Sequence, residues 1–329
     1  MTRLTVSSIL PVPPGDAFDW HLRDGAFERL TPPWDRTIVS ERSGSIEDET
    51  LVVRLETPIL GPIRQVLVAE HDGFVPGHRF RDTLVRGPFA SWAHEHLVFP
   101  LAGDPTRSLL VDDMRFTLPL EPFSRPAEWV GVRPRLRKMF GARHATCVGD
   151  LAAHAAAGLA PGITVQVHGH HGALRAQLEA YLSTGGATIA DDESSGTGEA
   201  DATVTIAAGT IRVAPAGGGG DVMLEHPTIV DPRLGTRLRQ AGPERAWISL
   251  DDLLGAIEWA IVGHLAAGTV SVAAPGTAGA DPLARSGYRW RSPTREHLRG
   301  LLRGAIPDRT VLSWNLPEDA DLPALAEGR

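Results

Sequence analysis

The stretch RFRDTLVRGPFASWAHEHLV, residues 79–98, decides how the first half of the chain folds. Apolar and polar residues alternate on both sides of RGPFA, whose glycine and proline are typical of a turn. Two alternating strands joined by a short turn form a β-hairpin. Because successive side chains of a strand point to opposite faces, Phe80, Asp82 and Leu84 share one face and Arg81 lies on the other.

The register of this hairpin follows from charge. One pairing places Asp82 opposite His94 and turns Trp92 and His96 to the same face as Asp82. A slip by one residue would place Asp82 opposite Glu95 and turn Trp92 toward water. Because two carboxylates that face each other are unfavourable, the sequence predicts the first pairing.

A later strand extends the same face, because Asp112, Met114, Phe116 and Leu118 again alternate with other residues. The face then combines apolar walls with a few polar groups, as small-molecule sites do. Aromatic residues of a preceding helix pair could close its mouth. A plain apolar core is the simpler alternative. The predicted cavity residues are Trp20, Phe27, Trp34, Phe80, Asp82, Leu84, Trp92, His94, His96, Asp112, Met114 and Phe116.

The two histidines of this face allow three interpretations. His94 and His96 could chelate a metal, with Asp82 or Asp112 as a third ligand. A histidine held by a carboxylate could also act as a general base. A hydrogen bond between histidine and aspartate that supports the wall is favoured over both. We therefore predict no bound metal and assign no catalytic residue. If the site is catalytic, His94 and His96 are the candidate residues.

The rest of the first half completes an α+β unit. A strand near 3–10 precedes a helix pair that breaks at Asp24-Gly25, and strands follow from 36 to 120. Turn signals fall at 43–45, 60–62, 71–73, 86–88 and 102–105. A long helix, 127–157, comes last. A curved antiparallel sheet around such a helix leaves a hollow for a ligand.

Beyond a boundary near 155–162 the order changes to the strand–helix alternation of an α/β fold. The predicted strands are 163–167, 187–190, 202–207 and 269–273, and the predicted helices are 174–183 and 250–265. Residues 191–200, 217–220 and 275–282 have the composition of flexible spacers, and only a short Gly/Pro-rich bridge is expected between Gly209 and Trp247. The domains are therefore 1–157 and 162–310, with 311–329 as a tail.

The second domain opens with VQVHGHHGALRAQLEAYLSTGG, residues 165–186. A strand, a Gly-x-x-Gly turn at Gly169 and Gly172, and a helix form the start of a dinucleotide-binding unit, and Asp191 stands where a ribose-binding carboxylate belongs. Arg175 replaces the third glycine, so the turn is vestigial. His168, His170 and His171 could bind zinc or nickel, but solvated turn histidines are the preferred interpretation.

Several segments carry a family resemblance. In the first half they are FDWHLRDGAFERLTPPW (18–34), AEHDGFVPGHRFRD (69–82), VRGPFASWAHEHLVF (85–99) and RLRKMFGARH (135–144). They resemble the START-like, helix-grip domain of the polyketide cyclase/dehydrase superfamily (SRPBCC), in the version fused ahead of an epimerase-like, extended short-chain dehydrogenase domain. In the second half the matching segments are 163–183, ADATVTIAAG (200–209), WISLDDLLGAIEWAI (247–261) and SGYRWRSPTREHLRGLL (286–302).

The resemblance implies a fold and an activity. The fold is a helix-grip domain followed by a reduced, Rossmann-like domain. The dehydrogenase family uses a Tyr-x-x-x-Lys pair, but the two tyrosines are Tyr181 and Tyr288, and the one lysine, Lys138, lies in the other domain. We therefore expect no dehydrogenase or epimerase catalysis and no cofactor, with residual NAD(P) binding as a weak alternative.

Composition limits the remaining classes of function. A formal net charge of −8 argues against nucleic-acid binding, and the single Cys147 suits a reducing cytoplasm. No apolar leader is expected, and the most apolar stretch, 253–268, is too short to span a bilayer. The basic segment 133–143, with Arg133, Arg137 and Lys138, could face a membrane or an anionic head group, although a solvated helix face is the default.

Three hypotheses follow. The first is a cytoplasmic protein that binds a hydrophobic or amphipathic small molecule in its START-like cavity, with a degenerate epimerase-like domain. The second is an enzyme, either cyclase- or dehydrase-like through His94 or His96, or NAD(P)-dependent. The third is a scaffold whose second domain binds a protein partner or a second copy of the chain.

Overall fold

A computed structural model describes residues 1–60, 63–170, 172–190, 200–236, 245–277 and 282–326 of the chain. The protein has a mixed α/β fold with a large antiparallel sheet. It consists of two compact units. The first comprises residues 1–22, 35–148 and 304–329, and the second comprises residues 23–34 and 149–303.

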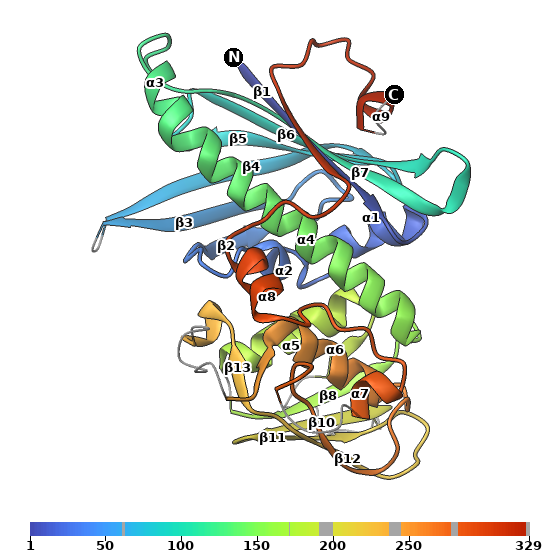
Figure 1. Ribbon diagram of the computed structural model, residues 1–329. Helices are drawn as coiled ribbons and strands as arrows, with labels where there is room; N and C mark the ends of the chain where they lie inside the picture. The colour runs from blue at the N-terminus through green and yellow to red at the C-terminus, as the bar shows by residue number, and fades with distance from the viewer. Residues whose placement is uncertain (61–62, 171, 191–199, 237–244, 278–281, 327–329) are drawn as a thin grey trace. The chain divides into compact units, whose positions relative to one another are not determined.

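The first unit is built on an eight-stranded antiparallel sheet in the order β16-β1-β7-β6-β5-β4-β3-β2 (Figure 1). The predicted hairpin forms as β5 and β6, and Asp82 lies opposite His94, which confirms the register. The strands are β1 (Thr2–Leu10), β2 (Ile38–Ser43), β3 (Val52–Leu60), β4 (Ile63–Val75), β5 (Arg79–Arg86), β6 (Ser91–Leu101), β7 (Asp104–Thr117) and β16 (Thr310–Trp314).

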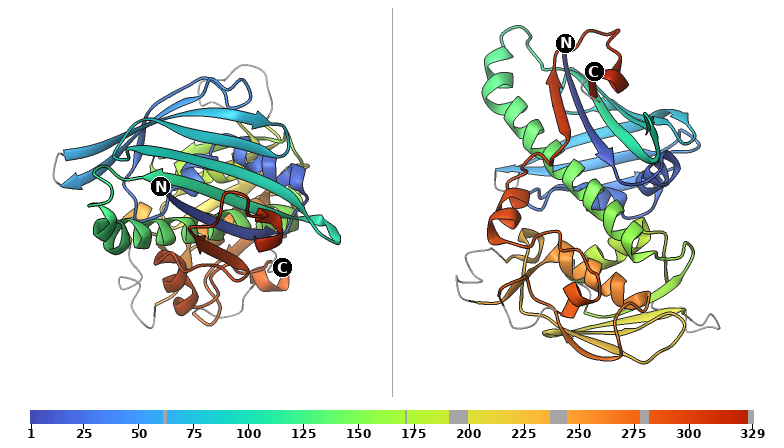
Figure 2. Two further views of the ribbon diagram at one scale, coloured as in Figure 1. Left: turned by 90° about the horizontal axis from the view of Figure 1, so that it is seen from above. Right: turned by 45° about the vertical axis from the view of Figure 1, so that its right-hand side comes forward.

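The long helix α4 (Arg133–Ala157) crosses one face of this sheet (Figure 1 and Figure 2). Leu136, Phe140, His144 and Cys147 recur at helical spacing and are all buried, so one stripe of the helix faces the strands. Leu136 and Phe140 pack against Leu4, Val6, Met114 and Phe116 of the sheet. The other helical elements of this unit are α1 (Pro14–Leu22), α3 (Arg125–Ala127), the π-helical turn η1 (Glu128–Val132) and α9 (Leu322–Ala326).

Two expectations for the first unit need correction. The predicted turn at 71–73 is wrong, because β4 continues to Val75 and the chain turns at residues 76–78. The register is irregular between Asp72 and Val75, so the Asp-Gly pair marks a bulge within the strand. Residues 311–314, expected in a tail, belong to β16, which pairs with β1. Of the turn expected at 60–62, residues 61–62 lie outside the described residues.

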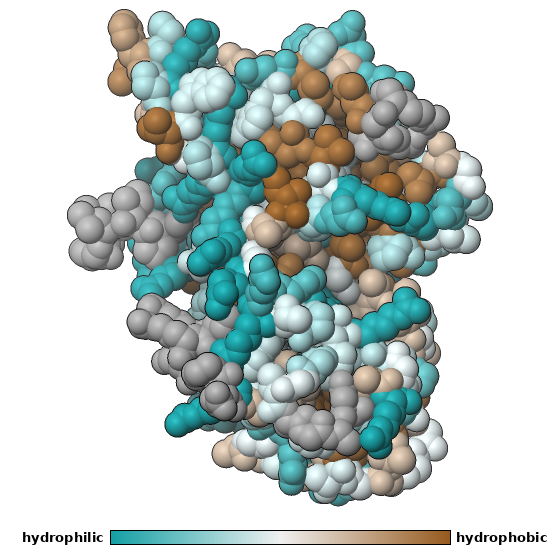
Figure 3. Space-filling model, viewed as in Figure 1, coloured by the Kyte–Doolittle hydropathy of each residue, from teal (hydrophilic) through white to brown (hydrophobic). Residues whose placement is uncertain are grey.

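Exposed apolar side chains gather where the sheet leads into α3 and η1. Leu120, Phe123 and Val130 are more than four-fifths exposed, and apolar surface is visible at this end of the unit (Figure 3). In the described part of the chain, no helix is both long and apolar enough to cross a membrane.

The second unit contains a six-stranded mixed sheet in the order β15-β12-β11-β10-β8-β9. Strand β8 pairs in parallel with β9 and β10, as a strand–helix–strand alternation requires, whereas β10, β11 and β12 are antiparallel neighbours. The strands are β8 (Thr164–Gly169), β9 (Thr188–Ala190), β10 (Ala202–Ala207), β11 (Thr210–Ala214), β12 (Val222–Glu225) and β15 (Gly268–Ser271), with a separate pair β13 (Thr228–Val230) and β14 (Trp247–Ser249).

The prediction that only a short bridge joins residues 209 and 247 is therefore wrong. This segment contains β11, β12, β13 and the short helix η2 (Pro232–Leu234), which glycine and proline had obscured. Helix α6 begins as its sequence predicts, because the Ser249 side chain caps it by accepting a hydrogen bond from the Asp252 N–H. The helices are α2 (Ala26–Leu30), α5 (Ala173–Thr184), α6 (Leu250–Ile261), α7 (Pro282–Arg285) and α8 (Arg295–Leu302).

Candidate functional site

Four ionisable side chains meet on the face of the first unit's sheet that α4 covers. We call Asp82, His94, His96 and Asp112 the inner-face cluster. The sheet register brings them together, because His94 lies opposite Asp82 on β5 and His96 lies opposite Asp112 on β7. The alternation of each strand turns all four to the same side.

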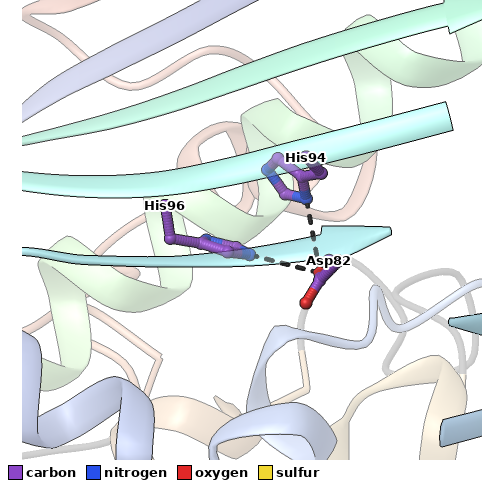
Figure 4. Close-up of side chains that lie close together, drawn as sticks. All are labelled: Asp82, His94 and His96. Atoms are coloured by element: carbon purple, nitrogen blue, oxygen red, sulfur yellow. Dashed lines mark ion pairs between the residues drawn. The ribbon is translucent and has the colours of Figure 1, made fainter. Parts of the chain in front are cut away.

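The two histidines on β6 both point toward the carboxylate of Asp82 on β5 (Figure 4). Oδ2 of Asp82 lies 3.7 Å from Nδ1 of His94 and 3.5 Å from Nε2 of His96. The opposite ring nitrogens face Asp112, whose Oδ1 lies 2.8 Å from Nδ1 of His96 and 3.5 Å from Nε2 of His94. Each imidazole therefore stands between two carboxylates.

His94, His96 and Asp112 are buried and Asp82 is partly buried, yet the polar atoms of the cluster are not satisfied by one another. His94 is 1% exposed and Asp112 is 4% exposed. Oδ1 of Asp82, Nε2 of His94, Nδ1 of His96 and Oδ1 of Asp112 have no aligned hydrogen bond, although ion-pair partners lie near them. Buried polar groups in native proteins are normally hydrogen-bonded, so this cluster requires an explanation.

Further polar groups flank the cluster, and the sequence analysis missed them. Nε2 of His71 lies 2.7 Å from Oδ1 of Asp82. On the other side, Nε2 of His144 lies 3.0 Å from Oδ2 of Asp112, and its Nδ1 lies 2.8 Å from the hydroxyl of Ser8. His71 was hidden by the turn wrongly placed at 71–73. His144 could have been found, because it follows Phe140 by four residues on the predicted helix.

His21 and Cys147 form another polar contact close to His96. The ring of His21, on α1, is centred 6.2 Å from the ring of His96, and its Nε2 lies 3.9 Å from Sγ of Cys147. His21 and Cys147 are both buried. No pattern in the sequence connected these two residues to the predicted cavity.

Apolar and aromatic side chains surround the cluster. The ring of Phe80 stacks on His96 at 4.4 Å, and the ring of Phe140 meets the edge of His94 at 5.3 Å. Trp20, Met114 and Phe116 are buried, whereas Leu84 and Trp92 are partly exposed. Phe27 and Trp34, which were expected to close the cavity, lie in the segment 23–34 of the second unit.

Burial and charge shift the pKa values of the histidines in opposite directions. Burial disfavours the charged form of His96, but the carboxylates of Asp112 and Asp82 outweigh burial and raise its pKa to about 9. Burial and the neighbouring His96 lower the pKa of His94. The same two effects lower the pKa of His21 to about 4.

The carboxyl groups of the cluster remain ionised. Burial would raise the pKa of Asp82, but the neighbouring imidazoles of His71 and His96 favour its charged form and hold its pKa far below the ordinary value. Burial also opposes ionisation of Asp112, whose pKa is nevertheless well below its ordinary value because of His96, His144 and His94. The cluster thus combines carboxylates with one neutral and one protonated imidazole at neutral pH.

The predicted nucleotide turn of the second unit depends on one of its glycines. Gly169 ends β8 with φ +119°, and a Cβ there would lie 2.5 Å from the carbonyl oxygen of Ile206. Gly172 has an extended backbone, and a Cβ there would lie 3.7 Å from its nearest neighbour, an ordinary contact with the His170 ring. Gly169 therefore serves strand pairing. Asp191 and His171 lie outside the described residues.

Arg175, at the position of the third glycine, is buried beside the turn. Its side chain is 8% exposed, and Nε lies 2.6 Å from Oε1 of Glu179 one helical turn later. Nη1 lies 3.5 Å from the carbonyl oxygen of Gly169, so the guanidinium group lies over the turn.

A second buried group of charges holds together distant segments of the second unit. We call Arg29, Asp150, Asp251 and Arg291 the ion network. Arg29 donates to both oxygens of Asp150, at 2.8 and 2.9 Å, and to Asp251 at 2.7 Å. Arg291 donates to Asp150 at 2.6 Å. Every atom of the Arg29 guanidinium that can donate has an acceptor, because Nη1 meets Gln177.

The two tyrosines of this unit are also engaged. The hydroxyl of Tyr181 donates to Oε2 of Glu258 at 2.6 Å, and the other oxygen of Glu258 lies 2.7 Å from Nδ1 of His154. The hydroxyl of Tyr288 donates to the backbone oxygen of Asp252 at 3.0 Å. Burial, and the charges of Glu258 and Asp252 respectively, raise both tyrosine pKa values well above their ordinary value.

The basic segment of α4 is not uniformly a solvated face. Arg133 is 9% exposed, and its Nε lies 2.8 Å from Oε1 of Glu128. Its guanidinium lies over the rings of Trp129 and Trp314, at 4.1 and 4.5 Å. Arg137 is exposed, as the default interpretation expects, and Lys138 is partly exposed.

Comparisons with known proteins place the fold. The chain matches no family model and no curated protein sequence. It is similar in structure to a nucleoside-diphosphate sugar epimerase from Corynebacterium glutamicum, with 18% identity, a TM-score of 0.65, and coverage of 92% of this chain and 91% of the other. At this identity the likeness concerns the fold alone.

Two smaller structures match about half of the chain. The Zhui aromatase/cyclase from Streptomyces sp. R1128 has 16% identity and a TM-score of 0.34, covering 47% of this chain and 96% of its own. A START superfamily protein from Mycobacterium smegmatis has 15% identity and a TM-score of 0.31, covering 43% of this chain and 94% of its own. The Corynebacterium glutamicum structure covers 92% of the chain, so its likeness of fold extends over both units.

Proposed function

We propose that the protein binds a hydrophobic or amphipathic small molecule in its first unit, with the inner-face cluster as the polar anchor. In this proposal the first unit is a START-like helix-grip domain whose sheet and long helix enclose the ligand. The second unit is a reduced Rossmann-like domain that does not carry out dehydrogenase chemistry and binds no cofactor.

The observation that carries the proposal is the convergence of ionisable side chains inside an apolar layer. Moving charged groups out of water is costly unless their partners satisfy them fully, and in the inner-face cluster they do not. Clusters of groups with shifted pKa values are common at functional sites. The aromatic side chains of Phe80 and Phe140 beside His96 and His94 suit a ligand with an apolar body and a polar group.

The buried tyrosines support the part of the proposal that concerns the second unit. Tyr181 donates a hydrogen bond to Glu258, and Tyr288 donates one to a backbone oxygen, so each hydroxyl already has a partner. The only lysine of the sequence, Lys138, belongs to the first unit. The Tyr-x-x-x-Lys arrangement of short-chain dehydrogenases therefore has no counterpart among these residues.

A second candidate function is cyclase- or dehydrase-like catalysis at the same cluster. The observation that favours it is the opposite shift of the two histidine pKa values. A neutral His94 could accept a proton from a substrate, and a protonated His96 could donate one. Catalysis of this kind would use the same bound molecule that the first proposal requires.

Two measurements test the proposed function. Native mass spectrometry of freshly purified protein should reveal a bound organic molecule. Titration with the amphipathic dye 1-anilinonaphthalene-8-sulfonate should show saturable binding that is weakened about tenfold by His96→Phe, the loss expected for one charge-assisted contact. Glu95→Gln is the matched control, because Glu95 lies on the same strand and the opposite face. The proposal would be contradicted if the purified protein carried no organic adduct and if His96→Phe and Glu95→Gln bound the dye equally well.

The second unit is tested separately by fluorescence titration with NADPH. The proposal predicts no saturable binding. Tight binding that is lost on replacing Arg175, beside the Gly169 turn, would instead restore the cofactor-dependent alternative.

A further inference from the structure

We infer that Asp82, His94 and His96 form a binding site for a divalent first-row transition-metal ion of the Zn²⁺ or Fe²⁺ type. The inference goes beyond small-molecule binding and does not depend on it, since an ion could bind with or without an organic ligand. Among the described residues, these three are the group whose ligand atoms lie close enough to share an ion, all within 4.8 Å of one another.

The distances within this group are too long for hydrogen bonds and suit a shared ion. Oδ2 of Asp82 lies 3.5 Å from Nε2 of His96 and 3.7 Å from Nδ1 of His94, whereas hydrogen bonds in proteins span about 2.7–3.2 Å. In a tetrahedral site with bonds of about 2.0–2.2 Å, neighbouring ligand atoms lie about 3.3–3.6 Å apart. The two distances to Asp82 are thus close to those between ligands of one ion, and the two imidazole nitrogens lie within 4.8 Å of each other.

The chemistry of the donor set selects the class of ion. Two imidazole nitrogens and one carboxylate oxygen suit zinc and iron, whereas calcium and magnesium prefer oxygen ligands. Three protein ligands are also the number found in catalytic zinc sites, where a water molecule or substrate completes the coordination. An ion here would be bound to the rigid centre of the sheet, because β5 and β6 supply all three ligands.

A second layer of residues is already in place around these ligands. Metal-binding histidines usually have a carboxylate or carbonyl at their other ring nitrogen, which fixes the ring. Here Oδ1 of Asp112 lies 2.8 Å from Nδ1 of His96, and His144 and Ser8 continue the chain of contacts behind Asp112. His71 takes the same supporting position at the other oxygen of Asp82, at 2.7 Å.

The histidines at 168–171 are the competing site within the chain. His168 lies at the end of β8 and His170 is exposed, and neither belongs to a group of three ligands among the described residues. A purified protein could still bind ions there weakly. The experiment therefore needs to separate the two places.

The test is a titration of untagged, chelator-treated full-length protein with Co²⁺, followed by its visible d–d absorption. The wild-type chain should bind one Co²⁺ with the intense absorption of a four- or five-coordinate site. His94→Gln and His96→Gln should each abolish this absorption, and Asp112→Asn should weaken binding about 10–100-fold. Glu95→Gln, on the opposite face of β6, and the double variant His168→Gln/His170→Gln should bind like the wild type.

The inference would be overturned by a wild-type chain that binds no Co²⁺, or by a site that is lost with His168 and His170 and kept without His94. Circular dichroism checks that each variant folds. Should a variant fail to fold, X-ray absorption of the wild-type Co²⁺ complex decides, because two imidazole ligands are expected and an all-oxygen shell would refute the site. A bound ion in a chain with neither an organic adduct nor dye binding that depends on His96 would leave this inference intact and contradict the proposed function. An organic adduct in a chain that binds no Co²⁺ would support the proposed function and overturn this inference.

Discussion

The two units each contain a buried group of charges, but the two groups are built differently. In the ion network of the second unit, Arg29 meets Asp150 through paired hydrogen bonds of 2.8 and 2.9 Å, and Arg291 adds a third. In the inner-face cluster of the first unit, His94 and His96 stand 3.5–3.7 Å from Asp82, and four polar atoms have no aligned hydrogen bond. A group of charges that satisfies itself serves structure, whereas one that does not is suited to bind something else.

The largest expected effect concerns the ion network. Arg29→Met leaves Asp150 and Asp251 with fewer partners in a buried place, which should lower the free energy of unfolding by about 3–5 kcal/mol. Urea unfolding of the full chain measures this loss. Arg212→Met is the control, because the Arg212 side chain is 60% exposed in its ion pair with Asp221, and it should cost less than about 1 kcal/mol. Equal losses in the two variants would show that the ion network is not structural.

At the inner-face cluster, a bound ion should instead stabilise the folded protein. Zn²⁺ at about one hundred times its dissociation constant should raise the free energy of unfolding by about 2.7 kcal/mol, because the ion binds only the folded unit. Thermal unfolding with and without Zn²⁺ measures the gain. His94→Gln should show none of it, and a gain that persists in this variant would place the ion elsewhere.

A smaller effect distinguishes the two glycines of the second unit's turn. Gly169→Ala should lower the free energy of unfolding by about 1–3 kcal/mol, because φ is +119° and a Cβ would meet the backbone of Ile206. Gly172→Ala, at an extended backbone with space around it, should change stability by less than about 0.5 kcal/mol. Urea unfolding of both variants checks this, and similar losses would mean that the turn itself needs two glycines.

The smallest effect appears in acid. Burial opposes ionisation of Asp150 and Asp251, but Arg29 and Arg291 lower both pKa values below the ordinary value near 4. Their contribution to stability is therefore fully present above about pH 4 and is lost as the pH falls from there through the folded pKa values. The free energy of unfolding of Asp251→Asn should fall less steeply below pH 4 than that of the wild type. If the free energy of unfolding of the two proteins fell equally steeply with pH, Asp251 would not contribute to the loss of stability in acid.

Much of the first unit could be predicted because strand alternation and charge act locally. The register that opposes Asp82 to His94 followed from the cost of facing Glu95, and it placed His96 and Asp112 on the same face. The helix pair, the long helix and the hairpin turn at residues 87–90 followed from periodicity and from glycine and proline.

The rest depended on contacts between residues far apart in the sequence. His71 was missed because the Asp-Gly pair after it resembles a turn, and only the pairing of β4 with β5 shows that the strand continues. His144 contacts Asp112, and Ser8 contacts His144. Helical spacing places His144 on the same stripe as Phe140, but no local pattern links it to Asp112 or to Ser8. The strands β11 to β13 were obscured by glycines and prolines, and Arg29 gave no sign that it would join Asp150 more than a hundred residues away.

The most direct measurement is a crystal structure of the protein as purified, with anomalous diffraction data at the zinc and iron absorption edges. We predict non-protein density in contact with Asp82, His94 and His96, with an anomalous peak between their side-chain atoms if the ion is retained. A cluster whose histidines and carboxylates close into aligned hydrogen bonds, with no density beside them, would contradict the view that the first unit's charges form a binding site.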